Sequence, residues 1–180
     1  NKRIIMKKII FSATLLLCLV MASCSKDEIG GTATKSVAGE WYVTVEGVDA
    51  SNKVVLSDGD LYGLGHQLMK TYNTAANTTD EIFVNMPFDL SNDGLPDYTF
   101  AQKVSCDINK MTFQSKTGST ETASISGGQI LPGQGIQPNG AKSDSIVFYV
   151  TFKGDAIPSG KGFVKYKVSG HRYSGLVNND

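Results

Sequence analysis

The side chains that could carry out acid-base or nucleophilic chemistry are few and widely separated. His66 and His171 are the only histidines among the 180 residues, so any Ser-His-Asp or Cys-His arrangement must use one of them. The chain contains no G-x-S-x-G sequence, which would present a serine on a strand-to-helix turn. Paired acids such as Asp80 and Glu81 lie in turn-like segments, where carboxylates usually face solvent. We predict no catalytic residue and favour a protein that is not an enzyme; if it is one, a hydrolase is expected.

Metal ligands are equally sparse. The two histidines and the cysteines have no zinc-site spacing. The segment from Asp89 to Gly94 resembles the start of a calcium loop, but its twelfth position is Phe100 where a bidentate glutamate is required. The segment therefore predicts an Asx-type turn, and neither a metal nor a cofactor is expected.

Aromatic side chains are the more informative set. In a closed barrel the inward residues form both the core and the wall of any apolar cavity, so the two roles cannot be separated by pattern. Tyr72, His171 and Arg172 are candidate polar groups for a ligand head group, although Arg172 fits equally well as a plug that packs on Trp41 over a closed barrel end. The candidate ligand-binding residues are Trp41, Tyr72, Tyr98, Phe148, Tyr166, His171 and Arg172.

The elements that must position these residues are strands. Apolar and polar residues alternate with a period of two, and turn signals such as Asp58-Gly59 and Thr117-Gly118 separate the alternating segments. Clear strands are predicted at 41–46, 82–88, 98–108, 111–114, 145–153 and 164–169, with weaker ones at 53–56, 122–126 and 172–177. The pattern places Cys106 on an apolar face. Two segments look irregular: 61–77, with a helical turn around 66–70, and 127–141, a long connection that could cover a site or be a disordered loop.

One-sided alternation is typical of antiparallel sheets with one dry face. The sequence therefore predicts an all-β domain of about eight to ten strands. A sandwich and a barrel satisfy the same alternation, and both remain open at this point.

The N-terminal segment predicts export and lipid attachment. From Met6 the chain reads Lys7-Lys8, an apolar run from 9 to 21 that is too short to span a bilayer as a helix, and then Ala22-Ser23-Cys24. This resembles the bacterial lipobox, after which Cys24 becomes the acylated N-terminus; plain secretion is the alternative. We predict upstream residues and a signal peptide at 1–23, an acylated Cys24 and flexible tether at 24–34, and the folded domain at 35–180.

Net charge limits the partners. The chain has 17 basic and 17 acidic residues, which disfavours nucleic acid. From Cys24 onward 13 basic residues remain against 17 acidic ones, a net charge of −4. Such a domain is soluble and is not drawn electrostatically to anionic lipid head groups. Attachment to the membrane is therefore expected through N-terminal acylation. Cys106 is the one cysteine of the mature domain, so it has no intramolecular disulfide partner.

Five stretches carry a resemblance to a known family: 71–77, 103–109, 128–132, 144–150 and 166–172. They resemble lipoproteins of Bacteroidota described as lipid-binding putative hydrolases. The resemblance implies a single antiparallel lipocalin-like β-barrel and favours it over the β-sandwich. The chain departs from the family's pattern at Tyr173 and Ser174, and at its ending 178–180, so any chemistry at those positions is in doubt.

The residues and the resemblance together predict a lipid-anchored outer-membrane protein. The segment 25–28 resembles a signal for the outer face, although it could be only a charged linker, so the domain is expected to face the cell exterior. We expect it to bind a lipid or another apolar small molecule without catalysis. One alternative is a hydrolase of an ester or glycan that uses His66 or His171. Another is a structural accessory of an outer-membrane uptake complex, with a filled barrel and outer-membrane protein partners.

Overall fold

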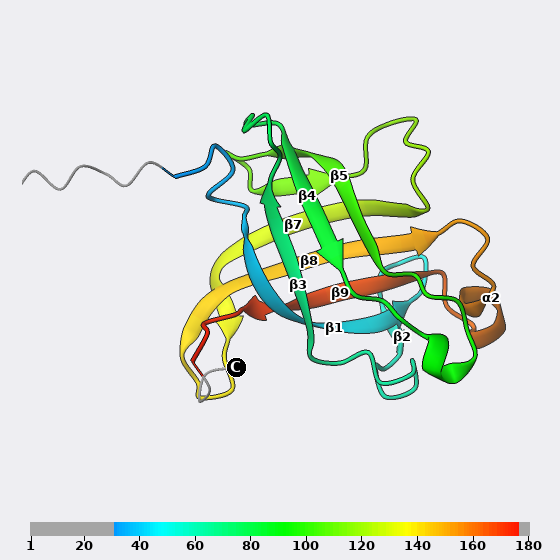
Figure 1. Ribbon diagram of the computed structural model, residues 1–180. Helices are drawn as coiled ribbons and strands as arrows, with labels where there is room; N and C mark the ends of the chain where they lie inside the picture. Colours follow the sequence, from blue (N-terminus) through cyan, green and yellow to red (C-terminus); the bar gives the residue numbers. More distant parts are fainter. Residues whose placement is uncertain (1–30, 177–180) are drawn as a thin grey trace, which may run out of the picture. The chain divides into compact units, whose positions relative to one another are not determined.

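The computed structural model describes residues 31–176, so the predictions for residues 1–30, Cys24 among them, and for 177–180 fall outside it. Within this range nearly all of the regular secondary structure is strand (Figure 1). The elements in chain order are β1 Gly39–Val48, β2 Val54–Leu56, β3 Gln67–Asn73, β4 Glu81–Met86, the 3-10 helix η1 Ser91–Asp93, β5 Phe100–Asp107, β6 Thr112–Gln114, β7 Ala123–Ile136, β8 Lys142–Phe152, the short helix α2 Ile157–Lys161 and β9 Lys165–Arg172.

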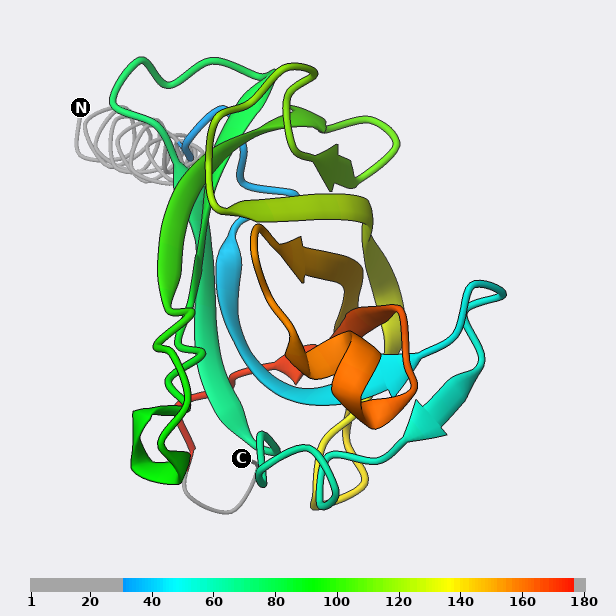
Figure 2. The ribbon, with the colours of Figure 1, turned by 90° about the vertical axis from the view of Figure 1, so that its right-hand side faces the viewer.

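The strands form one closed antiparallel barrel. Their order is β2-β1-β3-β4-β5-β6-β7-β8-β9, and β1 also pairs with β9 along its length, from Trp41 opposite Arg172 to Val48 opposite Lys165. Eight strands therefore close on themselves, and β2 is an extra strand at the end of β1. Figure 2 looks toward one end of this barrel, with α2 in front. The barrel interpretation is confirmed over the sandwich because no sheet edge remains between β1 and β9.

The predicted alternation fills the interior. On β1 every second residue from Trp41 to Val45 is buried, and on β8 the same holds from Ile146 to Phe152. The largest completely buried side chains include Trp41, Tyr166, Phe88 and Phe148, and the buried residues form one contiguous cluster. Burial of side chains this large dominates the stability of a small barrel.

Three sequence predictions of local structure are wrong. The segment around 66–70 is not a helical turn: β3 begins at Gln67, and the left-handed φ of 55° at His66 precedes it. The segment 127–141 is not a long loop, because β7 continues to Ile136 and turns into β8 at Lys142. Glycine and proline enter β7 at two register shifts, so their presence marked bulges rather than the absence of a strand. Beyond Arg172, residues 173–176 are not strand.

Candidate functional site

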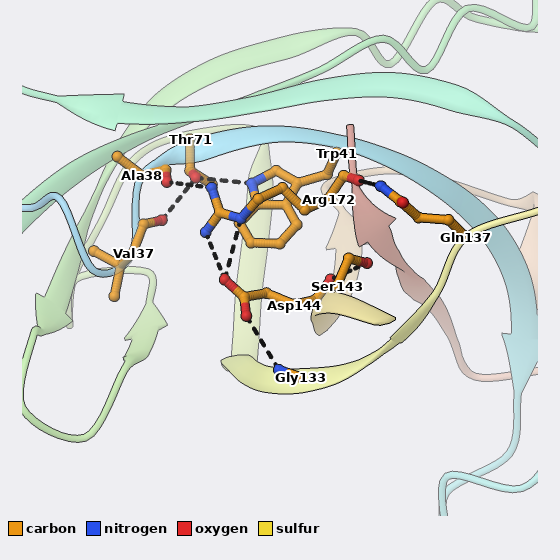
Figure 3. Close-up of polar contacts among 9 residues, drawn as sticks. All are labelled: Val37, Ala38, Trp41, Thr71, Gly133, Gln137, Ser143, Asp144 and Arg172. Carbon is orange, nitrogen blue, oxygen red and sulfur yellow. Dashed lines mark hydrogen bonds and ion pairs between the residues drawn. The ribbon is translucent and has the colours of Figure 1, made fainter. Parts of the chain in front are cut away.

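One end of the barrel is closed by Arg172 (Figure 3). Its guanidinium carbon lies 4.3 Å from the centre of the Trp41 ring, and Nη1 donates to the Ala38 carbonyl at 3.0 Å. Nε and Nη2 each lie 3.1 Å from Asp144 Oδ2. Trp41 Nε1 in turn donates to Thr71 Oγ1 at 3.0 Å. The cation is therefore stacked, matched in charge and hydrogen-bonded within the chain, which favours the plug interpretation of Arg172 over the head-group interpretation.

The β5 strand is left without a ladder partner over half its length. β6 pairs with β5 only from Ser105 to Asp107. From Phe100 to Val104, β5 therefore lacks a strand on that side, and the side chain of Gln102 makes the connection instead. Gln102 is only 3% exposed, and its Nε2 donates to the Ala123 carbonyl of β7 at 3.0 Å and to Ser115 Oγ at 3.2 Å. An amide side chain thus replaces backbone pairing at this place in the wall.

An open groove lies at this break, and we call it the lateral groove. Its volume is about 260 Å³. Three aromatic rings line it together with two acidic side chains. The lining residues are Asp97, Tyr98, Thr99, Phe100, Ala101, Gln102, Glu121, Thr122, Ala123 and Phe152. The groove thus presents aromatic rings beside carboxylate, hydroxyl and amide groups, and small-molecule sites combine apolar walls with polar groups that fix the ligand.

The aromatic rings of the lateral groove continue into the core. Tyr98 stacks on Phe152 with ring centres 4.6 Å apart, and Phe152 contacts Phe88 edge-on at 5.0 Å. Phe88 contacts the buried Tyr166 at 5.0 Å. Phe152 is 7% exposed, so it is the side chain that connects the groove to the interior. An apolar ligand in the groove would therefore meet packed rings rather than water.

A carboxylate behind these rings is held by two tyrosines. Asp155 accepts a hydrogen bond from Tyr98 OH at 3.0 Å, from Tyr166 OH at 2.7 Å and from the Ile157 N–H at 2.9 Å. Burial, and then the hydrogen bond to Asp155, raise the pKa values of both Tyr98 and Tyr166. Both hydroxyls are therefore protonated donors at neutral pH, and they fix α2 over this end of the barrel.

The two histidines lie on the outer face of the barrel, where both are next to Tyr42. His66 stacks on Tyr42 with ring centres 4.0 Å apart, and His171, the cross-strand partner of Tyr42, has its ring 6.4 Å from the same tyrosine. Tyr173 contacts Tyr42 edge-on at 5.2 Å. Four aromatic side chains from distant parts of the sequence thus form a surface cluster. The pairing of β1 with β9 brings them together.

The other predicted site residues separate into two groups. Trp41, Phe148 and Tyr166 are completely buried members of the packed core. Tyr72 is 37% exposed and stacks on Phe83, so it lies on the outer face of β3 and not among the inward residues. Of the seven predicted ligand-binding residues, the structure brings Tyr98 alone to the lateral groove. Phe100, Gln102 and Phe152 were missed as site residues because nothing in the alternating pattern shows where a strand lacks its neighbour.

Cys106, the one cysteine of residues 31–176, is less buried than predicted. Cys106 lies at the end of β5, is half-buried, and donates from Sγ to the Thr79 carbonyl at 3.4 Å. It lines a second open groove of about 510 Å³ over β5, β6 and β7, whose walls also include Asp107, Lys110 and Gln129. Burial, and then the carboxylates of Asp80, Asp107 and Glu81, raise the pKa of the thiol to about 11. Such a thiol is a poor nucleophile at neutral pH.

Three further observations concern metal binding, the Asp89 segment and membrane-spanning helices. Among residues 31–176 no group of three or more His, Cys, Asp and Glu side chains is placed to hold a metal ion. The Asp89 segment is a turn in which Oδ1 accepts the Ser91 N–H at 2.8 Å, as predicted. The part of the chain that the structure describes contains no helix long and apolar enough to cross a membrane.

Comparison with known proteins gives one result. A family model described as "lipid-binding putative hydrolase" matches residues 26–177, which include the whole barrel. No curated protein matches the chain.

Proposed function

The chain belongs to the family of lipid-binding putative hydrolases, and from that premise we propose that it is a non-catalytic outer-membrane lipoprotein that binds a lipid or another apolar small molecule at the lateral groove. Acylation of Cys24 would attach it to the membrane, with the barrel facing the cell exterior. The support for anchoring is the sequence from Met6 to Cys24. The support for the binding site comes from the barrel wall.

The observation that carries the proposal is the break between β5 and β7. There the rings of Tyr98, Phe100 and Phe152 line a groove that solvent reaches, while the Gln102 side chain makes the hydrogen bond from β5 to β7. Each methylene buried against such rings contributes about 0.8 kcal/mol. The groove volume of about 260 Å³ lies just below the roughly 300–1,000 Å³ of typical ligand pockets. We therefore expect one acyl or alkyl chain to enter rather than two.

The opposite end of the barrel fits a ligand less well. A shallow depression of about 520 Å³ adjoins Arg172 and is lined also by Lys35, Met111 and Pro132. Its arginine is already paired with Asp144 and stacked on Trp41. A ligand that took this cation would have to replace both contacts, which costs binding free energy.

The experiment is native mass spectrometry of the chain carrying Cys24→Ser, incubated with a bacterial lipid extract, with released molecules identified after denaturation. We expect a stoichiometric apolar adduct. Thr122→Trp fills the lateral groove and should remove it. Ser124→Trp is the matched control, because Ser124 lies two residues further along, at the start of β7, is exposed and does not line the groove. An adduct that persists in Thr122→Trp would place the ligand elsewhere.

A filled interior favours a second candidate function. Trp41, Phe88, Phe148 and Tyr166 are all completely buried within one core cluster. A barrel packed in this way can serve as a rigid accessory of an outer-membrane uptake complex, with its function on the outer surface. A clean protein mass in every lipid incubation would favour this function over lipid binding.

A further inference from the structure

The charged side chains that line the lateral groove are all anionic. Asp97 and Glu121 supply two carboxylates, and neither a lysine nor an arginine lines the groove. Lys153 follows the lining residue Phe152. Its backbone N–H donates to the carbonyl of Thr122, which also lines the groove. An anionic head group placed here would meet like charges and no cation.

The side-chain amide of Gln102 also favours a ligand that donates hydrogen bonds. Gln102 lines the groove at 3% exposure, and both hydrogen bonds of its amide group are donated by Nε2, to Ser115 and Ala123. No described residue donates to its Oε1, which therefore remains an acceptor for a group in the groove. This oxygen can accept a hydrogen bond from an ammonium or a hydroxyl, and not from a carboxylate or phosphate oxygen.

The aromatic lining completes the pattern. The rings of Tyr98, Phe100 and Phe152 lie beside the two carboxylates. Aromatic faces attract cations through their quadrupole and also bind methylene groups. The groove thus combines a surface for an apolar chain with a negative rim.

From these contacts we infer that the lateral groove selects a single-chain amphiphile with a cationic, hydrogen-bond-donating head group, such as a long-chain amine. The alkyl chain packs against Phe100 and Phe152, and the ammonium lies at the rim between Asp97 and Glu121 and within reach of Gln102. This inference rests on the proposed function, because it names the ligand class of the same groove. It excludes free fatty acids as the preferred ligand.

The test compares amphiphiles of equal chain length below their micelle concentrations. Dodecylammonium, dodecanol and dodecanoate are titrated into the Cys24→Ser chain at pH 7 by calorimetry. We expect dodecylammonium to bind about tenfold more tightly than dodecanoate, with dodecanol between them, and the preference to shrink in 0.5 M salt because the rim is exposed.

Isosteric variants test whether Asp97 and Glu121 cause the preference for dodecylammonium. Asp97→Asn keeps the acceptor for the Thr99 N–H, and Glu121→Gln keeps the side-chain length. The double variant should lower the preference to less than about threefold, because it weakens the binding of dodecylammonium more than that of dodecanoate. Asp93→Asn is the matched control, since Asp93 is exposed and does not line the groove, and it should keep the wild-type preference.

The outcomes separate the inference from the function on which it rests. If none of the three amphiphiles binds, the groove is not a lipid site and both proposals fail. If dodecanoate binds as tightly as dodecylammonium or more tightly, lipid binding stands and the selectivity inference is overturned. In that case, loss of dodecanoate binding in Arg172→Ala would place the ligand in the depression beside Lys35 and Arg172 instead.

Discussion

Arg172 and Trp41 join the last barrel strand to the first: the guanidinium carbon lies 4.3 Å from the centre of the indole ring, and the two residues are direct cross-strand partners. Since Arg172 also donates to the Ala38 carbonyl and to Asp144, one side chain ties together β9, β8 and the entry to β1 (Figure 3). Trp41 is completely buried, so the arginine covers its ring at the barrel end.

We therefore expect Arg172→Ala to lower the free energy of unfolding by about 2 kcal/mol, through loss of the stacking and of charge-assisted hydrogen bonds. Arg172→Lys should recover only part of this free energy, because lysine lacks the planar guanidinium group that donates several hydrogen bonds at once. Urea unfolding measures both variants. The control is Lys70→Ala, whose ion pair with Glu40 is exposed and should matter by less than about 0.5 kcal/mol. Ligand binding should be unchanged in Arg172→Ala; its loss would support the head-group interpretation.

The hydroxyl of Tyr166 should contribute measurably to stability. It is buried and donates to Asp155 at 2.7 Å. Tyr166→Phe removes a hydrogen bond to a charged acceptor and should cost about 1.5–3 kcal/mol in chemical denaturation. Tyr149→Phe is the control, because Tyr149 lies at the surface with Lys165 over its ring. Equal destabilisation by both variants would contradict a special role for the Asp155 hydrogen bonds.

Stability should fall at alkaline pH for the same structural reason. The pKa values of Tyr98 and Tyr166 are raised in the folded protein above their ordinary value near 10. A raised folded pKa contributes stability that is fully present below the unfolded pKa and is lost as the pH rises above it. We expect the free energy of unfolding to decrease from about pH 10 upward. In Tyr166→Phe the decrease should be shallower, and an unchanged pH profile would be evidence against this assignment.

The alternation could predict an antiparallel all-β domain because its determinants are local, whereas the barrel was chosen over the sandwich from the family resemblance. The alternation at 41–46 and 145–153 sets which side chains face inward, and the structure confirms it on β1 and β8. The segment 127–141 was wrongly predicted to be a loop, since glycine and proline occur both in loops and at bulges such as those in β7. All of β3 was missed, because Gly63, Gly65 and His66 weaken the strand signal immediately before it and the segment 61–77 was taken as irregular.

The candidate site was largely beyond sequence reasoning. The lateral groove depends on β6 being only three residues long and on Gln102 reaching Ala123, a relationship between segments about twenty residues apart that no periodicity encodes. Tyr98 was found because aromatic residues were taken as candidates in general. The stacking of Arg172 on Trp41 was anticipated as one of two alternatives, and geometry was needed to choose between them.

Cys106 should react slowly with alkylating reagents. Its pKa is raised to about 11, first by burial and then by the neighbouring carboxylates, so the thiolate is about 100-fold scarcer at pH 8 than for a thiol of ordinary pKa. The rate of iodoacetamide incorporation, followed by peptide mapping to isolate Cys106, should rise about tenfold per pH unit up to about pH 10. The unfolded chain is the control and should react at the rate of a free thiol. Fast, pH-independent labelling of the folded protein would show that the thiolate is stabilised.

Gly170 should be required for barrel closure. A Cβ at this position would lie 1.9 Å from the Tyr42 carbonyl oxygen and 2.7 Å from Val43 Cα, and backbone atoms cannot move aside as a flexible side chain can. Gly170→Ala must therefore separate β9 from β1 and should lower the unfolding free energy by about 3 kcal/mol or more, comparable to overpacking a core. Thermal unfolding and soluble yield both report this. Gly160→Ala is the matched control: its Cβ meets nothing within 4 Å, and in α2 alanine should stabilise by about 0.4–1 kcal/mol. A Gly170→Ala protein as stable as the wild type would show that β1 and β9 are not packed this closely.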